Sequence, residues 1–342
     1  MGKVGSLPLV DRPTLREDRP SGNSQVALRE RHPGQSGHRR EEVSSNRVEY
    51  EREGFVQAAD GTRLFYELLG EGEPPVILTD GIGCDGFAWR YLAPRLARHH
   101  RVIHWHFRGH GRSGPPEDFA RLSIEDLADD LKRVCDELDA TRPVIIAHSM
   151  GVQVALEFYR QNPNGVAALV LMCGTFGRIT TTFHGTDLLD QLLPGLMRGM
   201  RMFPGIARAV WGRVPAAMAF RVACAGRELD AERIQEEDFH RYWEHAALMN
   251  PEVFLPMLEH AGRHDARGFL ADVDVPTLVV AAEHDTFTPM SLAEEMAGAI
   301  PNAVLEVIEG ASHAAPVEQP DLLGEHIEDF LTARLGLGRS RP

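Results

Sequence analysis

The feature that most constrains this chain is the alternation of short apolar runs with helix-like segments. Runs such as PVIIAHS (143–149) and VAALVLMCG (166–174) are rich in Val, Ile and Leu, as buried strands are. The segment SIEDLADDLKRVCDELDA (123–140) is amphipathic and opens with an approximate capping box of Ser123 and Asp126. The alternation predicts an α/β fold with a mostly parallel sheet and helices on both faces.

Two regions depart from the simple alternation. REGFVQAADGTRLFYELLG (52–70) holds two β-rich runs around Asp60-Gly61, which predicts an antiparallel hairpin at one sheet edge. Residues 175–272 contain helix-like segments with no strand between them, over 187–203, 215–226, 228–249 and 251–262. We expect this insertion to form a helical cap over the carboxyl ends of the strands, where open α/β sheets place their ligands. The predicted core is then 47–174 together with 273–336.

The two ends of the chain differ in composition from this core. Residues 1–46 are rich in Arg, Glu, Ser, Gly and Pro and poor in large apolar residues, which predicts a disordered arm; residues 337–342 form a short tail. A net charge of −14 makes nucleic acid an unexpected partner. The four cysteines are far apart, and no apolar run is long enough to span a membrane. We therefore expect a cytoplasmic protein without a transmembrane segment; its oligomeric state stays open.

A serine stands where a strand meets a helix, in AHSMG (147–151). Ser149 has two interpretations: an N-cap of the helix, or a nucleophile on a sharp strand-to-helix turn. The small residues Ala147 and Gly151 allow such a turn. The helix N-terminus would also direct N–H groups at a developing negative charge. The serine alone does not decide between the two.

Two further residues favour the nucleophile. Asp285, in AAEHDTFTP, ends one predicted strand, and His313, in EGASHAAPVEQP, follows the last one. The carboxyl ends of parallel strands meet at one edge of a sheet, so both residues belong on the same edge as Ser149. The chain order Ser…Asp…His predicts a triad of nucleophile, orienting acid and base.

These motifs, together with FRGHGRSG (107–114), resemble the α/β-hydrolase fold superfamily over residues 47–335. The resemblance implies an α/β-hydrolase fold with Ser149 as nucleophile. Dehalogenases and epoxide hydrolases of the superfamily carry Asp at that position, which argues against both activities.

One residue departs from the family pattern. The family usually has His-Gly after the third strand, and this chain has Asp80-Gly81. Alignment on Gly81 makes the backbone N–H groups of Ile82 and Met150 the expected oxyanion-hole donors. An ionised Asp80 near the oxyanion would be unfavourable unless it points away and is held by hydrogen bonds, or is protonated.

The run HWHFRGH (104–110) raises the question of a metal site. Strand alternation places His104 and His106 on one face. The H-x-H-x-D-H spacing of metallo-hydrolases is not met, because Arg108 stands where the Asp belongs and His110 comes one residue late. We therefore expect neither a metal nor a cofactor. His148, beside Ser149, is interpreted as a packing or loop-bonding residue.

The sequence thus predicts a serine hydrolase that cleaves small to medium carboxylic esters through an acyl-enzyme. Lactonase, thioesterase, C–C bond hydrolase and perhydrolase activities use the same triad and remain open. A non-catalytic ligand-binding member of the fold is a further alternative. Met and aromatic residues in 175–272 favour a small-molecule substrate with an apolar acyl or ring group.

Overall fold

The computed structural model describes residues 48–178, 180, 188–203, 233–234 and 236–336, together with positions 205, 209, 211, 213, 216 and 218. The predicted arm (1–46) and tail (337–342) lie outside the described residues. So does the helix predicted over 215–226, apart from two isolated positions.

The described chain forms one eight-stranded sheet with the strand order β1-β2-β4-β3-β5-β6-β7-β8. The strands are β1 (Arg52–Gln57), β2 (Arg63–Leu69), β3 (Val76–Thr79), β4 (Val102–Trp105), β5 (Val144–His148), β6 (Ala168–Met172), β7 (Thr277–Ala282) and β8 (Ala303–Ile308). β1 pairs with β2 and β2 with β4 in antiparallel fashion, whereas every pair from β4 to β8 is parallel. The predicted mostly parallel sheet with a hairpin at one edge is confirmed.

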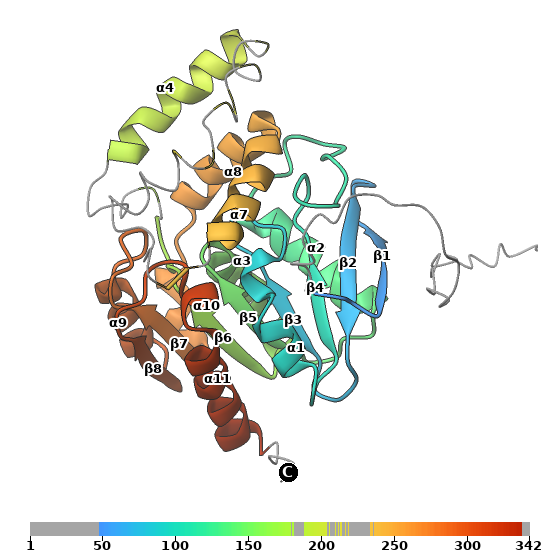
Figure 1. Cartoon of the computed structure of the whole chain (residues 1–342), viewed down its shortest axis with the longest axis vertical. Helices are drawn as coiled ribbons and strands as arrows, with labels where there is room; N and C mark the ends of the chain where they lie inside the picture. Colours follow the sequence, from blue (N-terminus) through green and yellow to red (C-terminus); the bar gives the residue numbers. More distant parts are fainter. Residues whose placement is uncertain are drawn as a thin grey trace, which may run out of the picture.

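Helices cover both faces of this sheet (Figure 1). The α-helices of the sheet layers are α1 (Leu92–Leu96), α2 (Ile124–Glu137), α3 (Met150–Gln161), α9 (Met290–Ala299), α10 (Ala315–Glu318) and α11 (Pro320–Leu335). Short 3₁₀ turns accompany them at η1 (Phe87–Trp89), η2 (Pro163–Gly165) and η5 (Arg267–Asp272). Buried residues of α2, α3 and α9 share one hydrophobic cluster, and those of α1, α10 and α11 share another on the opposite face.

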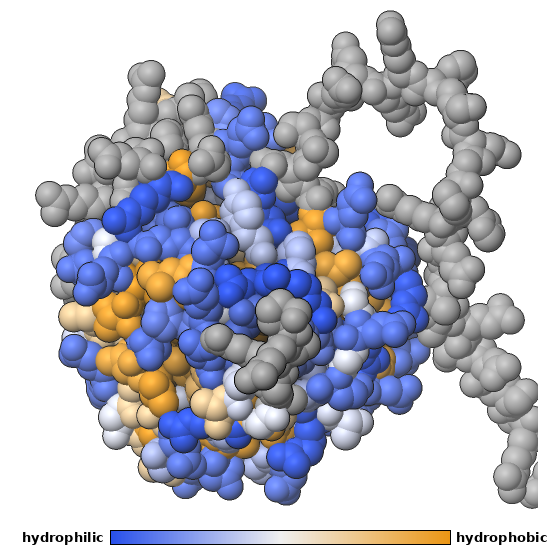
Figure 2. Space-filling view, turned by 60° about the horizontal axis from the view of Figure 1, so that its bottom comes forward, coloured by the Kyte–Doolittle hydropathy of each residue, from blue (hydrophilic) through white to orange (hydrophobic). Residues whose placement is uncertain are grey.

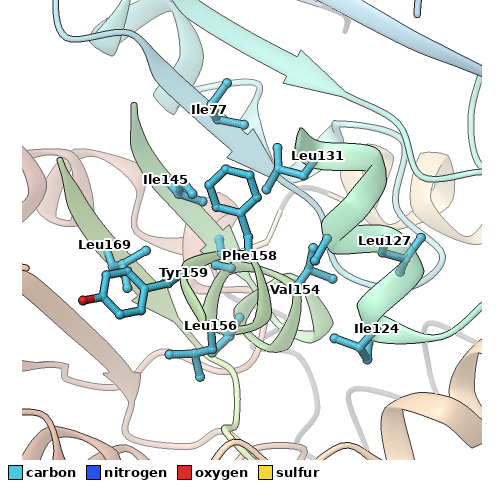
Figure 3. Packing of buried hydrophobic residues seen from close by; sticks show 14 of the residues in the cluster. Ile77, Ile124, Leu127, Leu131, Ile145, Val154, Leu156, Phe158, Tyr159 and Leu169 are labelled. Atoms are coloured by element: carbon cyan, nitrogen blue, oxygen red, sulfur yellow. The ribbon is translucent and has the colours of Figure 1, made fainter. Parts of the chain in front are cut away.

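The packing of α2 and α3 against the sheet gives Ser149 a rigid base. The predicted capping box starts α2, with Ser123 and Asp126 bonding each other's backbone N–H. Phe158 of α3 lies between Ile145 of β5 and Leu131 of α2 (Figure 3), and all three are buried. Because the helix and strand on either side of Ser149 are packed in this way, the turn between them has little freedom.

Only helical structure lies between β6 and β7 in the described part of 175–272. Besides η5, the helices whose bounds are described there are α4 (Leu188–Met202), α7 (Glu236–Leu248) and α8 (Pro251–Arg263). Leu193 and Met197 of α4 pack against Leu258 of α8. α4 lies farthest from the sheet, with α7 and α8 nearer to it (Figure 1). The domain boundaries drawn from the sequence stay predictions.

The face shown in Figure 2 is mixed in hydropathy, with hydrophobic side chains most frequent on its left side. On the face in Figure 2, hydrophobic side chains lie among hydrophilic ones, as is usual for a folded chain. None of the helices in the described ranges combines the length and apolar character needed to cross a bilayer.

Candidate active site

The turn that carries Ser149 is sharp and strained. Ser149 joins β5 to α3 with φ 56° and ψ −124°, a conformation that side-chain-bearing residues rarely adopt. A β-carbon at Gly151 would lie 2.5 Å from the Thr79 carbonyl oxygen, so the start of α3 requires glycine there. Ala147 is fully buried in β5 and fits without such a conflict. The turn therefore requires glycine at position 151, whereas alanine is accommodated at position 147, where the common G-x-S-x-G pattern has its first glycine.

The hydroxyl of Ser149 is directed at a histidine rather than at its own helix. Its side chain makes no capping hydrogen bond to α3, which removes the N-cap interpretation. Ser149 Oγ lies 3.0 Å from Nε2 of His313. With one nitrogen on the hydroxyl, the imidazole is placed to take its proton.

Asp285 orients that imidazole from the other side. His313 Nδ1 donates to Asp285 Oδ2 over 2.8 Å. Oδ1 accepts the N–H groups of Phe287 and Thr288, each at 2.8 Å, and Oδ2 also accepts the Thr288 hydroxyl at 2.7 Å. Burial alone would raise the pKa of Asp285, but the charge and hydrogen bond of His313 and the bonds from Thr288 hold it below its usual value. The three sequence-predicted side chains thus form one hydrogen-bonded series.

Two buried groups hold the loop that carries His313. Nε2 of His148 donates to the His313 carbonyl oxygen over 3.0 Å. Glu318 accepts the backbone N–H and the hydroxyl of Ser312 at 2.7 and 2.6 Å. Burial, with the nearby charge of His313, lowers the pKa of His148 to about 4, so it stays neutral. This agrees with the interpretation of His148 as a loop-bonding residue.

The loop after β3, residues 80–86, lies against the Ser149 turn. A β-carbon at Gly81 would come within 2.9 Å of Ser149 Cβ. Among the hydrogen bonds of the described residues, none uses the N–H of Ile82 or of Met150. Both N–H groups are therefore unengaged within the described part of the chain, and their use as oxyanion-hole donors stays a prediction.

His110 holds the tip of the 80–86 loop. Gly83 donates its N–H to His110 Nε2 over 3.1 Å, while His110 Nδ1 donates to the Arg108 carbonyl oxygen at 3.1 Å. Burial lowers the pKa of His110 to about 4. It is therefore a neutral acceptor at neutral pH.

Asp80 is held by hydrogen bonds, as an ionised carboxylate near the oxyanion was expected to require. Its Oδ1 accepts the indole N–H of Trp89 at 2.6 Å, and its Oδ2 accepts from His104 Nε2 at 2.9 Å. Burial would raise the pKa of Asp80, but the charge and hydrogen bond of His104 keep it below its ordinary value. The carboxylate is ionised, and both of its oxygens are engaged by N–H donors.

Glu67, His104 and His106 come close enough together to resemble a metal site. Glu67 Oε1 lies 3.3 Å from His104 Nδ1 and 3.6 Å from His106 Nε2. His106 Nδ1, however, accepts the Arg112 N–H at 2.8 Å, so its Nε2 carries the hydrogen and has no lone pair for a metal. The two imidazoles therefore direct N–H groups at the Glu67 carboxylate, an arrangement that suits hydrogen bonding better than metal binding. The prediction that the chain needs no metal stays a prediction.

Helices α7 and α8 contact the 80–86 loop and the residues that follow it. A β-carbon at Gly83 would lie 3.4 Å from the Phe254 ring of α8 and 3.6 Å from the Tyr242 ring of α7. Asp238 of α7 forms an ion pair with Arg90. Aromatic side chains of α7 and α8 therefore lie beside the loop that packs against the Ser149 turn.

Sequence reasoning missed several supporting residues. Thr288 follows Asp285 by three positions, a spacing at which a hydroxyl can bond back to a preceding carboxylate. Glu67, Trp89 and Glu318 gave no signal, because their partners are 37, 9 and 6 residues away and no helix or strand periodicity relates the two positions. Strand alternation predicted that His104 and His106 share one face, but it did not predict that Glu67 of β2 stands opposite His104.

The chain matches the family model for the alpha/beta hydrolase fold over residues 74–320. It is 29% identical to 2-hydroxy-6-oxononadienedioate/2-hydroxy-6-oxononatrienedioate hydrolase 2 from Pseudomonas putida, covering 85% of this chain and 97% of that protein. It also resembles a thermophilic esterase from Thermogutta terrifontis, with 25% identity, a TM-score of 0.67, and 82% and 98% of the two chains covered. An enol-lactonase from Burkholderia xenovorans LB400 shares the fold at 23% identity with a TM-score of 0.65, covering 81% of this chain and 99% of that one. The fold, the order of its strands and the family match agree, and the chain belongs to the α/β-hydrolase family.

Proposed function

We propose that this α/β-hydrolase is a serine hydrolase that cleaves small to medium carboxylic esters through an acyl-enzyme. The observation that carries the proposal is the hydrogen-bonded series Ser149–His313–Asp285, with 3.0 and 2.8 Å between its partners. A nucleophile, its base and a group that orients the base are what acyl transfer requires.

In the proposed reaction, Ser149 Oγ attacks the substrate carbonyl while His313 Nε2 takes its proton. Asp285 keeps the imidazole in the tautomer with hydrogen on Nδ1 and stabilises the imidazolium that forms. The same proton then goes to the leaving alcohol, which leaves an ester on Ser149. Water, deprotonated by His313, attacks that ester and releases the acid.

The proposed oxyanion hole consists of the Ile82 and Met150 N–H groups. Backbone donors keep their place when a neighbouring side chain changes, so Asp80 in place of the usual His is compatible with the hole. Preorganised donors of this kind are worth about 10²- to 10³-fold in kcat each.

We expect an apolar acyl or ring group in the substrate. Tyr242 and Phe254 beside Gly83 support this expectation, because aromatic side chains favour apolar ligand groups. An alternative on the same triad is cleavage of a carbon–carbon bond. The relative named for 2-hydroxy-6-oxononadienedioate favours it, since that compound holds no ester bond to hydrolyse.

The test is hydrolysis of p-nitrophenyl esters of increasing acyl length by the wild type and by Ser149→Ala. The proposal expects turnover in the wild type, a loss of more than about 10³-fold in Ser149→Ala, and an optimum chain length that measures the acyl site. Vinylogous 1,5-diketones and enol-lactones are assayed in parallel to separate the alternatives. A folded wild type with no turnover of any ester contradicts the ester proposal, and turnover of diketones alone favours carbon–carbon cleavage.

A further inference from the structure

We propose that Asp80 is a positioning residue, which together with His104 fixes the 80–86 loop so that the Ile82 N–H faces the oxyanion. This inference rests on the proposed function, because it concerns the reaction at Ser149. It assigns a use to a buried ionic group that departs from the family's usual His-Gly pair.

Asp80 anchors the start of the loop. The residue is fully buried, and its two oxygens accept hydrogen bonds of 2.6 Å from Trp89 and 2.9 Å from His104. Because Trp89 belongs to η1, the first of these bonds ties the chain beyond the loop back to its beginning. With both oxygens engaged, the carboxylate cannot rotate without losing a charge-assisted bond.

His104 supports the far end of the same loop. Gly86 has φ +90°, and a β-carbon there would lie 2.5 Å from His104 Cε1. The chain therefore passes in close contact over the imidazole that Asp80 holds. Both ends of the 80–86 loop rest on one side chain.

His104 is in turn fixed to the sheet. Glu67 stands directly opposite it in the β2–β4 ladder and lies 3.3 Å from its Nδ1. Burial would lower the pKa of His104, but the charges and hydrogen bonds of Asp80 and Glu67 raise it to about 10. At neutral pH a buried imidazolium thus bridges two carboxylates, and each of its nitrogens has one acceptor.

Ile82 lies between two fixed points. Behind it is Asp80, and ahead of it Gly83 donates to His110 over 3.1 Å. If the start of the loop shifts, the Ile82 N–H shifts with it, because only Gly81 and Ile82 lie between the two held residues Asp80 and Gly83. The expected consequence is a loss of transition-state stabilisation with little change in substrate binding.

The first test is Asp80→Asn, compared with the exposed Asp136→Asn as a matched control. The asparagine amide carries no charge and has one acceptor oxygen, so the charge-assisted bonds that hold the loop start are lost. We expect kcat to fall by about 10- to 100-fold with KM within about twofold. The inhibition constant of a trifluoromethyl ketone, whose adduct places an oxyanion in the hole, should rise by the same factor. Asp136→Asn should change none of these.

Two further variants keep the test decisive if Asp80→Asn folds poorly. Trp89→Phe removes one hydrogen bond and keeps the ion pair, and we expect a smaller fall in kcat, again without a change in KM. His104→Gln leaves two buried carboxylates without their cation, and its Tm should fall by roughly 10 °C. The double variant Asp80→Asn/His104→Gln removes the uncompensated charge at position 80 and leaves Glu67 as the one ionised member, so it should regain Tm but not kcat.

Hydrogen exchange of the peptide over residues 80–91 separates this proposal from the proposed function. Faster exchange there in Asp80→Asn supports the positioning role, even if the wild type hydrolyses none of the esters. Unchanged exchange in Asp80→Asn, or kcat and ketone inhibition equal to wild type in a folded Asp80→Asn or Trp89→Phe, overturns it.

Discussion

At the scale of single residues, the same physical problem recurs around Ser149: each buried polar group needs a partner. Asp285 is held by His313, Thr288 and two backbone N–H groups, and Asp80 by Trp89 and His104. An unpaired buried carboxylate would be costly, so each of these contacts fixes a position as well as a charge.

Asp285→Asn tests the orienting role of this carboxylate. The asparagine oxygen can keep the N–H groups of Phe287 and Thr288, and its amide then faces His313 Nδ1. The imidazole is held in the tautomer that donates to Ser149 instead of accepting from it. We expect kcat to fall by roughly 10³- to 10⁴-fold while the protein stays folded, as measured by ester hydrolysis and circular dichroism. A loss below about tenfold would contradict the assignment.

His148 predicts a pH dependence of stability. Its pKa is about 4 in the fold against an ordinary 6.5, so the unfolded chain binds the additional proton between these values. The contribution of neutral His148 to the unfolding free energy is therefore fully present above about pH 6.5 and is lost as the pH falls toward 4. Between pH 6.5 and 4, the unfolding free energy of the wild type should fall by on the order of 3 kcal/mol more than that of His148→Gln, as measured by denaturant titration. A difference between the two proteins that is independent of pH would show that His148 is not buried in its neutral form.

At the scale of elements, the sequence was most informative where burial repeats along the chain. The strands from β3 to β8 fall within predominantly apolar segments, β1 and β2 form the predicted hairpin, and α2 begins at the capping box that Ser123 and Asp126 predicted. The short elements η5 and α10 were not predicted, because four to six residues carry too little periodicity. The order of β3 and β4 in the sheet likewise depends on long-range pairing.

The Gly151→Ala substitution, which adds one methyl group, tests the close approach of α3 to the end of β3. A β-carbon at Gly151 would lie 2.5 Å from the Thr79 oxygen and 2.6 Å from the Asp80 oxygen, so Gly151→Ala forces α3 away from β3. We expect a loss of about 1–3 kcal/mol in unfolding free energy, with a lower kcat because Ser149 moves. Gly195 in α4 has no atom within 4 Å of such a carbon, so Gly195→Ala should be neutral or stabilising by up to ~1 kcal/mol. Equal effects in urea unfolding would contradict the close approach.

At the scale of the whole molecule, the candidate site joins the sheet to helices that are distant in sequence, since Arg90 and its partner Asp238 are 148 residues apart. Ser149, Asp285 and His313 could be predicted because they follow strands whose ends meet at one sheet edge. The contacts of α7 with the segment after β3 could not be predicted. They consist of ion pairs and ring contacts between distant positions, such as Arg90 with Asp238 and Phe87 with Tyr242.

Asp238→Ala tests whether these contacts hold α7 in place. Asp238 is fully buried and Arg90 only partly exposed, so removal of the carboxylate leaves a poorly solvated guanidinium. We expect a loss of about 2–3 kcal/mol in unfolding free energy and faster proteolysis within residues 236–263. Asp136→Ala breaks the exposed pair with Lys132 and should cost less than about 1 kcal/mol. Similar losses in both variants would argue against a docking role for Asp238.

The most direct test of the central claim is covalent labelling of Ser149. The wild type is treated with a fluorophosphonate and mapped by peptide mass spectrometry, beside Ser149→Ala and His313→Gln. We expect an adduct on the peptide that contains Ser149, no adduct in Ser149→Ala, and much slower labelling in His313→Gln. A folded wild type that takes up no label, or a label that persists in Ser149→Ala, would contradict that claim.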